Sequence, residues 1–326
     1  MTDSAANQSI AVYRSIAALP AGFGPTVASI GNFDGVHRGH RELLSAVVAE
    51  AQHLRARAVA ITFDPHPEQF LHPEAAPELL TPLDERIRLL AATGIDAVLV
   101  LPFDAALAAE PAREFLCRVL IDALGLCSLH EGANFRFGRR AEAGIDELRA
   151  WGEEFGFALH VHPAVHVHGL EVSSSAIRTL VAEGEMRRAR WMLGHPFTIH
   201  STQERGRGVG TRLLVPTVNL SAYTGQVPAF GVYVTRMRIG DRLFRSVTNV
   251  GNRPTFAGVG FSIETYILDF EPVEMTATTP IEIEFLLRLR GEAKWPSPEA
   301  LKAQIMKDVA RAQRYFRLEQ LLVPTK

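Results

Sequence analysis

The stretch that most constrains this chain is Ser29 to Leu44, which reads S-I-G-N-F-D-G-V-H-R-G-H-R-E-L-L. An apolar run ends at Gly31, and a helical pattern of apolar residues begins at Leu43. The stretch contains three glycines and the pair His37 and His40. Glycine lets the backbone approach an anion, and the free N–H groups at a helix start point toward it. The pattern predicts a strand, a turn and a helix start that together bind phosphate.

The two histidines make this prediction more specific. Glycine-rich turns are common, whereas H-x-G-H at a strand-to-helix turn is much rarer. Imidazoles in the first helical turn add hydrogen-bond donors near physiological pH. The simpler interpretation is that His37 and His40 are solvated side chains beside a structural turn. We favour the phosphate site.

Length, charge and cysteine content narrow the class of protein. A chain of 326 residues is long for one hydrophobic core and favours two domains. The formal net charge is -2, from 34 basic and 36 acidic residues, so neither a nucleic-acid partner nor a membrane surface is indicated. Prolines and glycines interrupt the uncharged stretch from Ser15 to Phe33, which argues against a membrane span. Composition leaves the oligomeric state open.

The expected location is the cytoplasm. Cys117 and Cys127 are too few to form a disulfide framework or a C-x-x-C metal knuckle. The N-terminal residues lack a basic segment followed by an unbroken apolar core, so no secretory signal is expected. Both observations fit a reducing compartment.

The first half alternates strand and helix patterns. Strands are predicted at Ala58 to Phe63 and at Ala97 to Leu101. Helices are predicted at residues 84–93, capped by Thr81, and at residues 111–124. This alternation predicts an α/β domain with a doubly wound parallel sheet, of the Rossmann-like kind. We place the domain at residues 1–186.

Four histidines near the end of this half alternate with valines. They are His160, His162, His166 and His168, and the spacing predicts one strand. Their spacing could suggest a metal site, but we expect no carboxylate or thiolate set to accompany them. We therefore expect a polar strand face. His66, between two prolines, is interpreted as a structural turn residue.

The stretch G-N-F-D-G-V-H-R-G-H resembles the signature of the nucleotidyltransferase superfamily, in the form found in bacterial bifunctional riboflavin kinases/FAD synthetases. Three more motifs follow in that family's order. Asp64-Pro65-His66-Pro67 resembles F-x-P-H-P, residues 132–138 resemble G-x-x-F-x-F-G, and residues 172–178 resemble I-S-S-T-x-I-R, with Ser175 in place of threonine. Together the motifs cover nearly all of residues 27–186. The resemblance implies transfer of AMP from ATP to FMN, which yields FAD and pyrophosphate.

The resemblance also implies roles for single residues. His37 and His40 are expected to hydrogen-bond the α and β phosphates of ATP as catalytic residues, and Ser174, Ser175 and Arg178 are expected to hold the leaving pyrophosphate. The alternative for the last three is an ordinary serine cap with a solvated arginine. The expected ATP- and phosphate-binding residues of this half are Gly31, Asn32, Phe33, Gly39, Ser174, Ser175 and Arg178.

Two further residues are expected to bind the flavin. Asp64 follows a predicted strand of the sheet, and ligand loops of open α/β sheets lie at such ends. Asn134 carries an amide that both donates and accepts hydrogen bonds. The alternative for Asn134 is a plain turn residue.

The second half, residues 187–326, changes to strands and turns. After a short helix at residues 186–193, strands are predicted at residues 198–202, 231–239, 243–250, 261–268 and 281–289. Turns are predicted at Gly240-Asp241 and at Asn252-Arg253-Pro254. A helix is predicted at residues 297–322. A run of strands followed by one helix predicts a small antiparallel β-barrel domain.

This half resembles the riboflavin kinase module of the same family. Pro216-Thr217-Val218-Asn219 resembles P-T-A-N, which implies that Thr217 and Asn219 lie beside the ATP phosphates and Mg²⁺. The stretch from Ile263 to Leu268 resembles the strand with the family's catalytic glutamate, which makes Glu264 the expected base. Other matches are Gly231-Val232-Tyr233, Asn249-Val250-Gly251 and Arg253-Pro254-Thr255-Phe256.

The second half also departs from the family pattern. Leu214 replaces a glycine before P-T-A-N, Ser201-Thr202-Gln203 replaces an opening G-x-V, and no D-L-Y-G is recognisable at residues 271–280. Three glycines still offer an expected phosphate loop, for which the alternative is a basic hairpin tip. They are Gly206, Gly208 and Gly210.

We therefore interpret the chain as an enzyme that phosphorylates riboflavin to FMN and adenylylates FMN to FAD, with ATP as co-substrate and Mg²⁺ as cofactor. Three alternatives remain open from the sequence. One is an FAD synthetase with a degenerate flavin-binding kinase module. Another is a nucleotidyltransferase for a different phosphorylated acceptor. The third is a flavin-sensing regulator that is not an enzyme.

Overall fold

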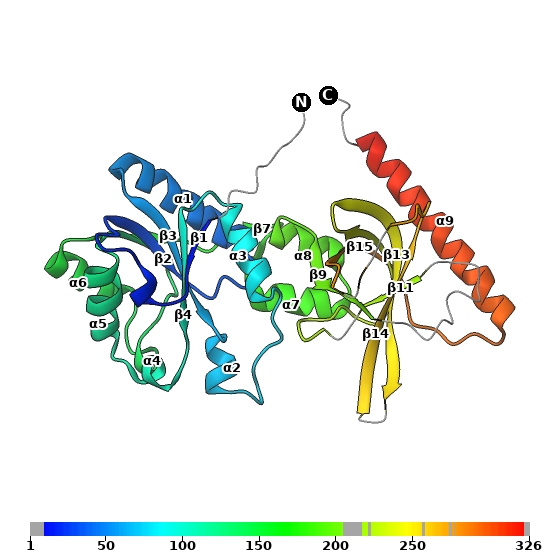
Figure 1. Ribbon diagram of the computed structural model, residues 1–326, viewed down its shortest axis with the longest axis horizontal. Coiled ribbons are helices and arrows are strands. Elements are labelled where there is room, and N and C mark those ends of the chain that lie inside the picture. The colour runs from blue at the N-terminus through cyan, green and yellow to red at the C-terminus, as the bar shows by residue number, and fades with distance from the viewer. Residues whose placement is uncertain are drawn as a thin grey trace. The chain divides into compact units, whose positions relative to one another are not determined.

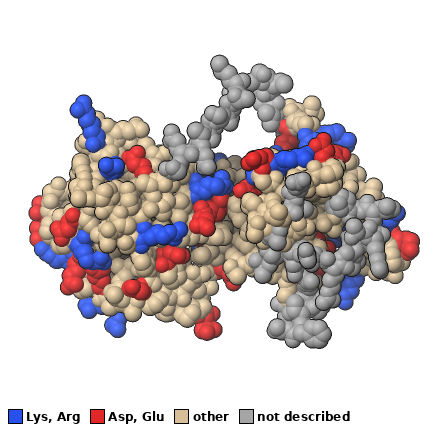
Figure 2. Space-filling view, viewed as in Figure 1, with Lys and Arg blue, Asp and Glu red and all other residues tan. Residues whose placement is uncertain are grey.

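The computed structural model describes residues 10–204, 217–220, 223–255, 258–273, 276 and 278–322 (Figure 1). The chain divides into two compact units, Met1–Ser174 and Ser175–Lys326. This division lies 12 residues before the expected boundary between residues 186 and 187, which stays a prediction. In the described part of the chain, no helix is both long and apolar enough to span a bilayer. On the face drawn in Figure 2, acidic and basic side chains are interspersed.

The first unit is built on a parallel sheet, which confirms the predicted fold class. Its strand order is β1-β4-β3-β2-β5-β6, and every neighbouring pair is parallel. The order reverses at β2, because β3 and β4 lie on one side of it and β5 and β6 on the other. Ligands of such sheets bind where the order reverses, beyond the carboxyl ends of the strands. The strands are β1 (Ala11–Tyr13), β2 (Thr26–Ile30), β3 (Arg57–Asp64), β4 (Ala97–Pro102), β5 (Leu126–Gly132) and β6 (Ala158–His162).

Helices cover both faces of this sheet, and successive strand residues point to opposite faces. Val27 packs in a core with residues of α1 (Arg38–Leu54) and α3 (Leu83–Ala91). Its neighbour Ala28 packs on the other face, with residues of α5 (Ala112–Phe115), of the π-helical segment Leu116–Ala123 and of α6 (Ile145–Phe155). Shorter helices are α2 (Pro67–Leu71) and α4 (Ala105–Ala109). The predicted strands are apolar because both faces are buried.

Some predictions for this unit were wrong. Thr81 does not cap the helix that begins near it, because Pro82 occupies the N-cap position and the Thr81 hydroxyl is used elsewhere. The predicted helix at residues 111–124 is, by contrast, confirmed, as α5 continued by the π-helical segment Leu116–Ala123. The four histidines do not share a strand, because β6 ends at His162 and His166 lies in β7 (His166–Val167), which pairs with β8 (Leu170–Glu171) in a separate hairpin. A carboxylate does accompany His160, from Glu50 on α1.

The second unit begins at the second residue of α7 (Ser174–Glu183) and continues with α8 (Met186–Leu193). Its antiparallel sheet has the order β10-β11-β14-β13-β12-β15-β9 and curves into a half-barrel. This confirms the predicted fold class of the second half. The strands are β9 (Phe197–Ser201), β10 (Gln203–Glu204), β11 (Thr217–Leu220), β12 (Gly231–Ile239), β13 (Arg242–Thr255), β14 (Gly258–Ile267) and β15 (Ile281–Gly291). The last helix, α9 (Pro298–Leu322), packs Val309, Ala312 and Phe316 against one face of this sheet.

The two predicted turns of this unit had different outcomes. Gly240 has a φ of +55° between β12 and β13, so the turn at Gly240-Asp241 is confirmed. The prediction of a turn at Asn252-Arg253-Pro254 was wrong, because β13 continues to pair with β14 as far as Thr255, which lies opposite Gly258. Strand β13 therefore continues past Pro254, although a proline commonly marks a turn.

Candidate active sites

The first candidate site lies where three parallel strands end. The glycine-histidine stretch follows β2, Asp64 is the last residue of β3, and Asn134 follows β5. Because β3, β2 and β5 are neighbours in the sheet, their carboxyl ends lie along one edge. The backbone N–H of Gly31 donates to the carbonyl of Ile61 at 3.0 Å, which fixes the start of the loop against β3. The topology thus brings together residues that are 100 positions apart in the sequence.

His37 and His40 form the turn at the start of α1. His37 is the N-cap residue, and its Nδ1 accepts a hydrogen bond from the backbone N–H of His40 at 3.3 Å. The two rings stack, with 3.6 Å between centroids and 15° between planes. Because Nδ1 accepts, a neutral His37 ring carries its proton on Nε2 and can donate from there. Burial lowers the pKa of His40 well below its usual value, and His37 lowers it further, so His40 is neutral at physiological pH.

The loop before α1 adopts a backbone that non-glycine residues rarely adopt. Phe33 has a φ of +48° and Val36 a φ of +36°, and both side chains are buried. The Phe33 ring lies beneath Gly31, where an added Cβ would come within 3.2 Å of it, and meets His40 edge to face. An added Cβ at Gly39 would lie 3.3 Å from the His37 ring. Strained backbone of this kind is held where the surrounding structure determines it, commonly at functional sites.

Asp34 anchors this loop from inside. Its carboxylate accepts hydrogen bonds from the backbone N–H groups of Leu80 at 3.0 Å and Thr81 at 2.9 Å, and from the Thr81 hydroxyl at 3.2 Å. The Thr81 hydroxyl oxygen in turn accepts from the backbone N–H of Gly35 at 3.0 Å. The hydroxyl of Ser174 donates to the Asp34 carbonyl at 2.9 Å. The predicted pyrophosphate ligand Ser174 therefore also contacts the loop itself.

Arg86 is a second anchor, and sequence reasoning missed it. Its side chain is almost fully buried and donates to the carbonyls of Asn32 at 2.7 Å and Phe63 at 3.1 Å. Burial lowers its pKa, while the carboxylates of Asp34 and Asp64 act in the opposite direction. From the sequence, an arginine in an amphipathic helix is expected to face solvent. Only the packing of α3 against the loop shows that Arg86 is buried.

Glu131 is a buried carboxyl group beside the phosphate turn, and its side chain was also missed. Its Oε1 accepts the backbone N–H of Ile30, the last residue of β2, at 2.7 Å. Burial raises the pKa of Glu131 well above its usual value, and the hydrogen bond from Ile30 opposes this only in part. Folding thus shifts the proton equilibrium of this group toward its neutral form.

The remaining predicted residues of this half lie at the surface. Asp64 ends β3 and is exposed, and Asn134 is exposed in the turn after β5. On α7, Ser175 is exposed and Arg178 is half-buried, and both are counted with the second unit. Exposed polar groups of this kind are accessible to a ligand.

The second candidate site is a row of side chains across three antiparallel strands. Asn219 on β11 is paired with Glu264 on β14, and Glu264 is paired with Asn249 on β13. Directly paired residues project from the same face of a sheet. Thr217 lies two residues before Asn219 and shares that face. Asn249 was not among the predicted site residues, although it lies in a motif that resembles the family.

Glu264 is exposed, whereas Thr217 and Asn219 are half-buried. The predicted phosphate-loop residues Gly206, Gly208 and Gly210 lie outside the described residues, as does Leu214. The strand register alone thus brings three of the predicted kinase residues to one face.

Comparison with known proteins assigns each half of the chain to a described family model. A family model described as FAD synthetase matches residues 21–176, and one described as riboflavin kinase matches residues 193–316. The bifunctional riboflavin kinase/FMN adenylyltransferase of Pseudomonas fluorescens is 36% identical over 288 residues, which cover 88% of this chain and 92% of the relative. That of Escherichia coli (strain K12) is 34% identical over 294 residues, which cover 90% of this chain and 93% of the relative.

A solved structure extends the likeness to the fold of the whole chain. The crystal structure described as a macrolide-efflux protein from Streptococcus pneumoniae has a TM-score of 0.83 and 25% sequence identity, and the match covers 93% of this chain and 98% of that chain. The two family models, the relatives and the two sheets point the same way. The chain belongs to the bifunctional riboflavin kinase/FMN adenylyltransferase family, with an FAD synthetase part followed by a riboflavin kinase part.

Proposed function

We propose that the two reactions use two separate sites, one in each half of the chain. The turn at His37 and His40 transfers AMP from ATP to FMN, and the row around Glu264 transfers phosphate from ATP to riboflavin. We assign residues 1–186 to the first reaction and residues 187–326 to the second. The observation that carries the assignment is the hydrogen bond from the His40 N–H to His37 Nδ1, which prepares the opposite ring nitrogen as a donor.

Adenylyl transfer needs no nucleophile from the protein. A phosphate oxygen of FMN attacks the α-phosphorus of ATP, the bond between that phosphorus and the α,β-bridging oxygen breaks, and pyrophosphate leaves with that oxygen. The protein must hold two anions in line and stabilise the charge that grows on the phosphorus oxygens. His37 donates from Nε2, and the N–H groups at the start of α1 add the positive end of the helix dipole.

The remaining residues of this site are proposed to bind the two ends of the substrates. Gly31, Asn32, Phe33 and Gly39 shape the turn so that phosphate can approach the backbone. Ser174, Ser175 and Arg178 bind the leaving pyrophosphate through hydroxyl groups and a guanidinium, which are typical phosphate ligands. The exposed Asp64 and Asn134 bind the flavin.

Kinase chemistry needs a proton acceptor and a place for a magnesium nucleotide. Glu264 accepts the proton from the riboflavin 5′-hydroxyl as that oxygen attacks the γ-phosphorus of ATP. Thr217 and Asn219 offer neutral oxygen atoms on the face of Glu264, and this donor set fits Mg²⁺, which takes its other ligands from water and phosphate. When bound, the ion neutralises phosphate charge. Asn249 flanks Glu264 on the neighbouring strand.

The experiment that tests these assignments supplies the purified full chain with riboflavin, ATP and Mg²⁺ and resolves FMN from FAD over time. We expect FMN to appear first and FAD to follow. Supplied FMN should be converted to FAD without riboflavin. FAD formation only from supplied FMN would leave the kinase site unassigned, and turnover of neither flavin would contradict both assignments.

A further inference from the structure

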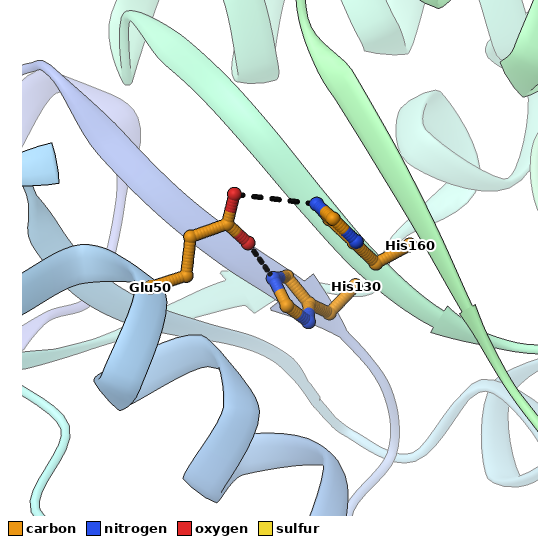
Figure 3. Close-up of side chains that lie close together, drawn as sticks. All are labelled: Glu50, His130 and His160. Carbon is orange, nitrogen blue, oxygen red and sulfur yellow. Dashed lines mark hydrogen bonds and ion pairs between the residues drawn. The ribbon is translucent and has the colours of Figure 1, made fainter. Parts of the chain in front are cut away.

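Three polar side chains to which no catalytic role is assigned meet on the α1 face of the parallel sheet. His130 on β5 and His160 on β6 are direct partners in the parallel ladder, so they project side by side. Glu50 reaches them from α1 (Figure 3). The three residues are 30 or more positions apart in the sequence, and only the packing of α1 on these two strands brings them together.

Their ligand atoms already converge. The Glu50 carboxylate contacts His160 Nε2 at 3.2 Å through one oxygen and hydrogen-bonds His130 Nε2 through the other. All three ligand atoms lie within 4.8 Å of one another. Ligands of a four-coordinate zinc ion stand about 3.4 Å apart, so side-chain shifts on the order of 1 Å would place all three around one ion.

A second layer of contacts supports this arrangement. His130 Nδ1 lies 3.0 Å from His162 Nε2. A ligating imidazole commonly donates its other N–H to a neighbouring group, which fixes its tautomer and the direction of the ring. If Nε2 of His130 holds an ion, Nδ1 carries the proton and donates to His162. The His130 ring is also stacked on His160, with 4.6 Å between centroids, so its rotation is restricted.

The burial of the group leaves a path for an ion. His130 is nearly fully buried, whereas 48% of the His160 side chain and 21% of the Glu50 side chain are exposed. One side of the cluster is therefore held by the core and the other is open to solvent. A site with three protein ligands and an open side leaves a fourth position for water.

We propose that Glu50, His130 and His160 form a binding site for a zinc-type divalent ion. Two imidazoles and one carboxylate are a donor set for Zn²⁺ and its neighbours in the first transition row, whereas Mg²⁺ prefers oxygen ligands alone. The ion fastens α1, which begins with the phosphate turn, to β5 and β6. This proposal does not depend on the roles assigned above to His37 or Glu264.

The test uses the full chain without a polyhistidine tag, stripped with EDTA and desalted. Zn²⁺ is titrated against a chromogenic chelator, and thermal unfolding is recorded with and without Zn²⁺. We expect one tightly bound ion per chain and a rise in Tm of about 4 °C or more. Substitution with Co²⁺ should give the visible absorption of a four-coordinate site.

Two variants locate the ion. His160→Ala removes a half-exposed ligand, and Glu50→Gln keeps the shape of its side chain but removes the charge. Each should weaken Zn²⁺ binding at least about tenfold and remove most of the rise in Tm. His53→Ala, an exposed histidine on the same helix, is the matched control and should leave both unchanged.

Three results would overturn the proposal. The first is a full chain that binds no Zn²⁺ or prefers Mg²⁺ to Zn²⁺. The second is equal Zn²⁺ affinity and stoichiometry in the original chain and in both variants, which would place the ion elsewhere. The third is an equal loss of affinity in His53→Ala, which would mean that surface histidines bind the ion without a built site.

Discussion

The Nδ1 atom of His37 accepts the backbone N–H of His40, and the two imidazole rings stack with their centroids 3.6 Å apart. One histidine therefore both closes the first turn of α1 and orients the other ring. A single substitution removes the cap and the stack together. The pair acts as one structural unit at the amino end of the helix.

We expect the double variant His37→Ala, His40→Ala to lose FAD formation and to keep FMN formation. The proposed donors to the transferring phosphate lie in the first unit, whereas Glu264 lies in the second. The measurement is the rate of FAD formation from supplied FMN and of FMN formation from riboflavin. Circular dichroism serves as the folding control. Loss of both activities in a folded variant would contradict separate sites.

Glu264→Gln keeps the size and hydrogen bonding of the side chain but removes the proton acceptor. Loss of a general base typically slows a reaction by about 10²–10⁴-fold, so the kinase rate should fall by that factor. Conversion of supplied FMN to FAD should stay near the original rate. Glu299→Gln, an exposed glutamate on α9, is the control and should change neither. An unaltered kinase rate in Glu264→Gln would mean that another group accepts the proton.

Arg86→Met should destabilise the chain. The change removes the guanidinium donor from the part-buried carbonyls of Asn32 and Phe63, of which Asn32 keeps a second donor, the Thr62 hydroxyl. Losing these two charge-assisted hydrogen bonds should lower the free energy of unfolding of the first unit by about 3 kcal/mol. FAD formation should fall with it, because Asn32 belongs to the phosphate turn. Arg149→Met, which removes an exposed partner of Asp146, should cost under about 0.5 kcal/mol. Urea unfolding measures both, and equal costs would show that Arg86 is not an anchor.

Glu131→Gln should stabilise the chain at neutral pH. Burial raises the pKa of Glu131 above its ordinary value of 4.5, so the folded state binds more protons than the unfolded state above that pH. This contribution to stability is fully present below pH 4.5 and is lost as pH rises through the raised pKa. The slope is at most about 1.4 kcal/mol per pH unit.

The measurement compares the free energy of unfolding of the original chain and of Glu131→Gln between pH 5 and pH 8. The variant keeps an acceptor for the Ile30 N–H, so its advantage should grow with pH until Glu131 is ionised. The exposed Glu153→Gln should show no such trend. An advantage that does not vary with pH would show that ionisation of Glu131 has no part in it.

Much of the fold could be predicted from local patterns. Apolar runs of five or six residues between glycines and prolines predict buried parallel strands, and the alternating stretches of the second half predict antiparallel ones. The sequence from Gly31 to His40 predicts a turn at a helix start. Its glycines and its N-cap histidine shape the backbone of residues only a few positions away, so this feature is local. The predicted turn at Asn252 failed because the pairing partner of β13, which lies far along the chain, decides where that strand ends.

The sequence by itself determined the kinds of element, the two motif-bearing halves and most of the residues proposed to bind phosphate, since these depend on spacing over one or two turns. Tertiary structure alone decided which residues from distant parts of the sequence contact these elements and support the proposed sites. Arg86 reaches two carbonyls, and Glu131 lies beneath Ile30, because helices and strands from separate stretches pack together. Glu50 meets His130 and His160 for the same reason. Such contacts depend on strand order and helix packing, which leave no periodic mark in the sequence.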